Sequence, residues 1–64
     1  MINLLLIVVM LYDGRTIVED YSYGHYDSYA ACYAAYHEAA NYGKERVKDL
    51  GSGYKLKFLK LDCD

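Results

Sequence analysis

The stretch Ile2 to Leu11 (INLLLIVVML) decides the fold of this chain. A strand that is covered on one side alternates apolar with polar residues, whereas this one is apolar at nearly every position. In a strand, alternate side chains point to opposite faces of the sheet. One face then carries Ile2, Leu4, Leu6, Val8 and Met10. The other face carries Leu5, Ile7, Val9 and Leu11. Both faces of this strand therefore need cover.

The length of the chain limits that cover. Sixty-four residues form one domain, close to the smallest size at which a single core is stable without help. Such a chain has one helix to offer, and one helix covers one face of a small sheet. We expect the other face to be buried against another molecule, most simply a second copy. The sequence does not decide which face meets the helix, and we assign the oligomer interface to Leu5, Ile7, Val9 and Leu11.

A hairpin follows the first strand. Asp13-Gly14 between two apolar runs is the preferred two-residue turn, because both positions require a positive φ. The turn predicts a second strand over 15–23, which is more polar, as suits an edge strand. The expected pairs are Tyr12 with Arg15, Met10 with Ile17, Val8 with Glu19, Leu6 with Tyr21 and Leu4 with Tyr23.

A helix and a third strand complete the chain. We expect Gly24-His25-Tyr26 to end the second strand, and Asp27 or Ser28 to cap a helix over 27–50 that stops at Gly51. Its apolar stripe is Tyr29, Cys32, Tyr33, Tyr36, Ala40, Gly43, Val47 and Leu50. The third strand, 54–63, changes its alternation at Phe58-Leu59, which indicates a bulge.

These elements predict an α+β fold of ββαβ layout, in a single domain over 1–64. The most apolar strand, 2–12, belongs in the middle of a three-stranded antiparallel or mixed sheet of order 2-1-3, a split β-α-β unit with one long helix on one face. A right-handed crossover is expected between the second and third strands. The third strand then runs antiparallel to the helix and brings Cys63 toward Cys32.

The two cysteines have no metal-ligand spacing. We favour the interpretation of two small buried thiols in a reducing compartment, with a disulfide between Cys32 and Cys63 as the alternative that the topology permits. The apolar start lacks the basic residues and cleavage site of a signal peptide, and Leu4 to Leu11 is too short to span a bilayer. We therefore expect a cytoplasmic protein without a membrane partner.

Composition argues against several functions. A net charge of −2 and a pI near 5.5 do not suit nucleic-acid binding. His25 and His37 have no neighbour that makes a nucleophile–base pair, so we expect no enzyme, no catalytic residue and no cofactor. The terminal acidic residues form no cage for a metal. Lys55, Lys57 and Lys60 suit edge protection, although two of them could bind a small anionic ligand.

Nine tyrosines are the compositional anomaly. Those on the helix stripe are expected in the core, whereas Tyr21, Tyr23 and Tyr26 cluster with His25 and are candidates for contact with a partner or ligand. Ala30 and Ala34 lie away from the stripe, and they either serve helix propensity or form a smooth surface for a partner.

The chain also resembles a type of protein. Met1-Ile2-Asn3-Leu4-Leu5-Leu6, the Asp13-Gly14 hairpin, Asp27-Ser28-Tyr29-Ala30-Ala31-Cys32 and a last strand ending in Cys63 resemble small proteins of tailed bacteriophages. The resemblance covers the whole chain. It implies a protein that binds and inhibits a host component, such as an antiviral defence protein in the host cytoplasm, and it supplies no catalytic residues.

We therefore predict a non-enzymatic binding protein that is a homodimer or higher oligomer and inhibits a host protein. The alternative is an oligomeric sponge that sequesters a nucleotide-like signalling molecule, with tyrosine stacking and lysine pairing supplying the affinity.

Overall fold

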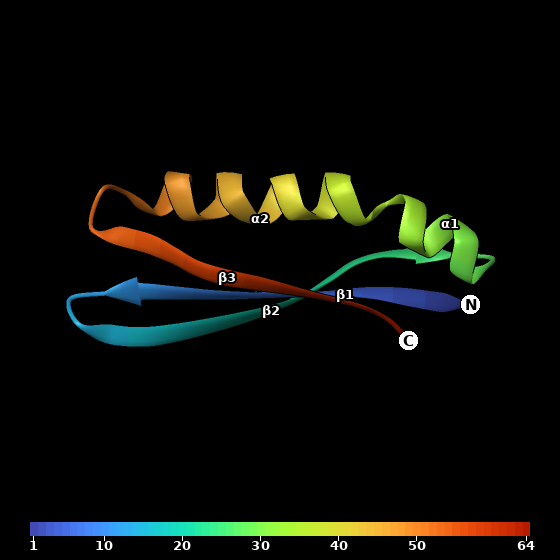
Figure 1. Cartoon of the computed structure of the whole chain (residues 1–64), viewed down its shortest axis with the longest axis horizontal. Helices are drawn as coiled ribbons and strands as arrows, with labels where there is room; N and C mark the ends of the chain where they lie inside the picture. The colour runs from blue at the N-terminus through green and yellow to red at the C-terminus, as the bar shows by residue number, and fades with distance from the viewer.

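The computed structural model describes all 64 residues and contains three strands and two helices. The strands form one antiparallel sheet in the order β2-β1-β3, and both helices lie on the same side of it (Figure 1). The elements are β1 (Ile2–Tyr12), β2 (Arg15–Tyr26), α1 (Tyr29–Ala34), α2 (Tyr36–Leu50) and β3 (Tyr54–Cys63). The predicted α+β fold and strand order are confirmed.

The hairpin between β1 and β2 forms at the predicted turn. Asp13 and Gly14 have φ values of 50° and 74°, which is the left-handed region that this two-residue turn requires. The predicted register is confirmed from the Tyr12–Arg15 pair to the Leu6–Tyr21 pair. Beyond it the prediction is wrong, because a bulge shifts the register and Leu4 pairs with Gly24 instead of Tyr23.

β2 is also longer than the sequence indicated. The prediction that it ends at Tyr23 is wrong, since His25 pairs with Asn3 and Tyr26 pairs with Ile2. Gly24 does not break the strand; it makes room for an aromatic ring. A Cβ atom at this position would lie 3.0 Å from the hydroxyl oxygen of Tyr26. The Tyr26 ring thus fills the space that a side chain at position 24 would take.

The expected single helix over 27–50 is two helices. Ser28 caps α1, and its hydroxyl accepts a hydrogen bond of 3.2 Å from the backbone N–H of Ala31. The break falls at Ala35, whose backbone N–H turns back to the carbonyl of Cys32. No glycine or proline causes it. The break lets α1 turn toward the sheet, where Cys32 is fully buried (Figure 1).

The core lies between β1 and the helices. Leu4, Leu6, Val8 and Met10 are fully buried, and small residues on α2 let the helix approach them closely. At Gly43 a Cβ atom would come within 2.8 Å of the Leu59 side chain. Two residues of the predicted helix stripe do not join this core: Tyr29 and Tyr33 are more than half exposed, so that part of the prediction is wrong.

The predicted bulge in β3 is confirmed. The register with β1 shifts between Val9 and Met10, which leaves Lys57 as the extra residue. As a result Phe58 lies opposite Val9 on the face away from the helices, while Leu59 packs against the core.

The molecule is a thin slab of 40 × 16 × 13 Å. Only nine of its 64 residues are buried. A slab of this shape gains little stability from its own core, because most of its surface stays in water.

Candidate functional site

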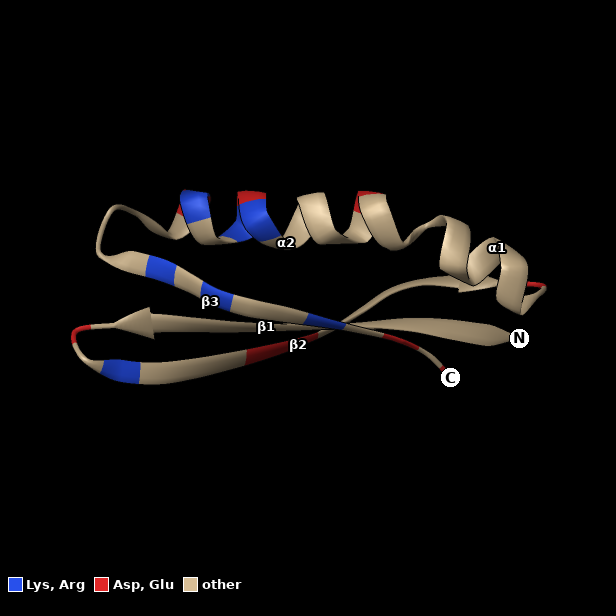
Figure 2. Cartoon of the chain, in the orientation of Figure 1, with Lys and Arg blue, Asp and Glu red and all other residues tan.

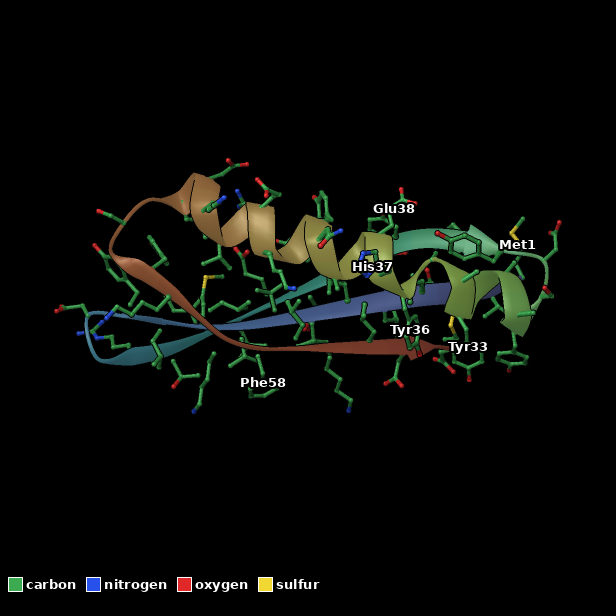
Figure 3. All side chains as sticks on the ribbon, turned by 45° about the horizontal axis from the view of Figure 1, so that its top comes forward. Met1, Tyr33, Tyr36, His37, Glu38 and Phe58 are labelled. Atoms are coloured by element: carbon green, nitrogen blue, oxygen red, sulfur yellow. A yellow bond between two sulfur atoms is a disulfide. The ribbon has the colours of Figure 1, made fainter.

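The face of the sheet that the helices leave uncovered, here called the open face, is apolar along its middle. β1 supplies Leu5, Ile7, Val9 and Leu11, and the neighbouring strands add an apolar residue on either side of Val9. These two, Val18 and Phe58, are 57% and 51% exposed. Figure 3 shows Phe58 pointing away from the helices. No segment of the chain covers this face.

The strand register sorts the open face into rows that run across β2, β1 and β3. The central row is entirely apolar, and the rows on both sides of it have an apolar residue on β1 with polar or charged residues at the edges. In order, the rows are Ser22–Leu5–Asp62, Asp20–Ile7–Lys60, Val18–Val9–Phe58 and Thr16–Leu11–Lys55. Figure 2 shows that β1 itself carries no charge.

An apolar centre within a polar rim is the pattern of protein–protein interfaces, and exposed apolar patches of this kind mark interaction sites. The four residues assigned to the oligomer interface from the sequence all belong to the open face. The structure thus locates these four residues on one face, and the oligomer itself stays a prediction.

The ion pairs of the rim are few. The Lys60 ammonium lies 4.0 Å from the Asp62 carboxylate, and both side chains are more than half exposed. Asp20 makes no ion pair within the chain. This edge of the open face therefore has an unpaired negative charge.

Tyrosines from β2 and α2 form a second feature, a seam along the edge of the helix layer. The Tyr42 ring contacts Tyr21 and Tyr23 edge to face, with ring centres 5.9 and 5.6 Å apart. Arg46 donates a hydrogen bond of 3.0 Å from Nε to the Tyr21 hydroxyl, which itself donates to Glu19. This seam joins α2 to the sheet.

The seam divides the cluster that the sequence suggested. Tyr21 and Tyr23 face the helices, where Tyr23 also donates a hydrogen bond of 3.0 Å to Glu38. Tyr26 packs against the same side, around Leu4. His25 pairs with Asn3 in the register of the opposite, open face. The three tyrosines therefore serve packing between layers, and His25 is separated from them.

Environment changes the acidity of the seam tyrosines. Burial, and then the hydrogen bond to Glu19, raises the pKa of Tyr21 above its ordinary value of about 10. Burial, and then the hydrogen bond to Glu38, raises the pKa of Tyr23 in the same direction. Both hydroxyls thus hold their protons more strongly in the folded chain than in the unfolded one.

We predict that the free energy of unfolding falls in alkaline solution. The unfolded chain loses these phenolic protons near pH 10 while the folded chain keeps them, so the stability is full below pH 10 and is lost as pH rises through the raised folded pKa values. Urea unfolding at pH 8, 9.5 and 11 measures this. The double variant Tyr21→Phe/Tyr23→Phe should show a shallower decline; an equal decline would contradict the assignment.

The other candidate surface lies on α1. Ala30 and Ala34 are exposed one turn apart. Beside them Tyr29 stacks on Tyr33 at 6.3 Å, and Tyr33 contacts Tyr36 at 5.2 Å, near the end of β3 (Figure 3). Exposed alanines and tyrosines on one short helix form a surface of low relief.

The cysteines are joined. Cys32 and Cys63 form a disulfide with a Cα–Cα distance of 6.1 Å, so the favoured interpretation of two free thiols is wrong. The bond ties α1 to the end of β3. Neighbouring this end, the Tyr36 hydroxyl donates a hydrogen bond of 3.2 Å to the backbone carbonyl of Leu61.

Small-molecule and metal sites are poorly developed. A shallow hollow of about 640 Å³ lies at the end of α2, lined by Lys44, Lys48 and Tyr54 among others. The partial negative charge of the carbonyl groups at the C-terminus of the helix disfavours the binding of an anion there. No group of three or more His, Cys, Asp or Glu side chains is placed to hold a metal ion. Neither helix is long and apolar enough to cross a membrane.

Comparison of the chain with protein-family models, with curated proteins and with solved structures gave no match. The function must therefore be argued from the surfaces described above.

Proposed function

We propose that this protein is a non-enzymatic binding protein that pairs with a second copy of itself through the open face. The single observation that carries the proposal is the apolar middle of the open face, where Leu11, Val18 and Phe58 are exposed and Leu5 and Ile7 are half-buried. Left in water, such a surface is an aggregation hazard. Pairing with an identical face removes it.

The thin shape supports the same proposal. The chain forms two layers, one sheet with helices on one side, and buries only nine residues. Two such slabs packed sheet to sheet would form four layers, with the two sheets about 10 Å apart and a second apolar core between them. Each copy would then contribute to the stability of the other.

We further propose that the dimer acts by occlusion of a host protein, as an inhibitor of phage origin in the host cytoplasm. The support is the resemblance in sequence layout to small phage proteins. In such a dimer the helix layers face outward. The surface of α1 with Ala30, Ala34, Tyr29 and Tyr33 would then be displayed on both sides and is the contact surface we assign to the host protein.

The solution mass across a dilution series tests the dimer. Light scattering should give about twice the chain mass at high concentration, with dissociation on dilution. A monomer at every concentration would refute the pairing. Native mass spectrometry after incubation with host extract tests the partner: a retained protein supports inhibition, whereas a retained small anionic molecule supports the sponge.

A further inference from the structure

We infer that the two copies pack their open faces with the β1 strands parallel, related by a two-fold axis that runs along the strands between the two sheets. This inference rests on the proposed dimer and adds the arrangement of its copies. The order of charges across the sheet and the position of its one entirely apolar row carry it.

The row through Ile7 places opposite charges at opposite edges of the open face. Asp20 lies at the β2 edge without an ion pair, and Lys60 lies at the β3 edge. A half-turn about an axis along β1 places the β2 edge of one copy over the β3 edge of the other. Asp20 then faces Lys60 of the second copy, and the symmetry repeats the pair. The dimer gains two ion pairs between copies.

Two other rows agree with this arrangement, while Lys55 and Asp62 face the uncharged Thr16 and Ser22 of the second copy. Val18 faces Phe58 of the second copy, so the apolar row meets an apolar row. Farther along, His25 and Asp64 lie at opposite edges of the row through Asn3, whose backbone is hydrogen-bonded to Asp64 at 2.8 and 2.9 Å. His25 therefore faces a carboxylate of the second copy as well.

A two-fold axis across the strands does not satisfy the charges and the apolar row together. With the axis at Val9, Lys60 faces Lys55 of the second copy, twice, and Asp20 faces Thr16. With the axis at Ile7, Asp20 and Lys60 each face their own equivalents. With the axis between these two rows, both charges lie over apolar side chains.

An axis between the Leu5 and Ile7 rows does pair Lys60 with Asp62 of the second copy, and an axis at Leu5 pairs it with Asp64. Both positions, however, move the apolar row of Val18, Val9 and Phe58 off its equivalent, onto the polar row through Asn3 or beyond it. The parallel arrangement is favoured because it pairs Asp20 with Lys60 and also places the apolar row against its equivalent.

Charge exchange between the two edges tests the arrangement. Asp20→Lys and Lys60→Asp each create two like-charge pairs in the parallel homodimer, and we expect each to raise the dissociation constant about tenfold. In an equimolar mixture the lysine introduced at position 20 faces the aspartate introduced at position 60. Native mass spectrometry should then show the mixed dimer as the main species.

Matched control variants separate the effect of charge position at the interface from the effect of net charge. Asp49→Lys and Lys44→Asp make the same charge changes at exposed positions of α2, and their mixture should give a statistical distribution of dimers. A dimer that Lys60→Asp tightens would overturn the parallel arrangement, because an axis across the strands at Val9 pairs the new aspartate with Lys55. A dimer insensitive to both exchanges would overturn it too, while leaving the proposed function intact. A monomeric unmodified protein would overturn both.

Discussion

Aspartate at position 6 should unfold the chain, whereas aspartate at position 7 should leave it folded and monomeric. The two positions are adjacent on β1 and face opposite sides of the sheet. Leu6 is fully buried beneath α2, next to Val8 and Val47. Ile7 lies on the open face, in the row between Asp20 and Lys60.

The expected loss at Leu6 exceeds the stability that the core supplies. Truncation of a buried leucine alone costs about 2–5 kcal/mol, and burial of an unpaired carboxylate adds several more. A core of this size supplies roughly 3–5 kcal/mol. Far-UV circular dichroism at neutral pH should therefore show Leu6→Asp as largely unfolded.

At Ile7 the carboxylate stays in water in the monomer, so the cost in the monomer is limited to strand propensity, about 1 kcal/mol. Light scattering should give the mass of one chain, with the circular dichroism spectrum retained. Asn41→Asp, which adds the same charge on the exposed side of α2, should remain dimeric. If Ile7→Asp formed a dimer as tight as that of the unmodified protein, the open face would not be the interface.

Local signals account for the part of the fold that the sequence predicts. The Asp13-Gly14 turn sets the hairpin register without help from the rest of the chain, and the apolar excess of β1 places it in the middle of the sheet. The end of β2 and the break at Ala35 depend on tertiary structure. The first requires His25 and Tyr26 to pair with Asn3 and Ile2 of β1, and the second requires α1 to reach the sheet near Cys63.

The tyrosine seam was missed, although its residues have a regular spacing. Glu38, Tyr42 and Arg46 are four residues apart and share one face of α2, while Glu19, Tyr21 and Tyr23 alternate along one face of β2. Two such series, each with carboxylate and tyrosine, predict a lateral contact once the helix is placed over the sheet. Taken one element at a time, the tyrosines resembled a ligand site.

The disulfide is expected to supply stability of the same size as the core. It closes a loop with a sequence separation of 31, for which the chain-entropy relation gives about 4 kcal/mol. Cys32→Ala/Cys63→Ala should therefore lower the free energy of unfolding of the isolated monomer by about half. Urea unfolding of the variant and of the unmodified protein at one fixed chain concentration measures the difference, because dimerisation also stabilises the fold.

Reduction provides the matched control for this loss. The unmodified protein in excess thiol should unfold at nearly the urea concentration of the double alanine variant, and the variant should not respond to thiol. A loss below about 1 kcal/mol would contradict a global role. Hydrogen exchange then locates the remaining effect: protection lost in α1 alone, with β1 and α2 unchanged, would mean that the bond only holds the short helix against β3. The proposed action in the host cytoplasm makes this comparison important. Thiols are kept reduced there, so the reduced chain would gain a larger share of its stability from its second copy.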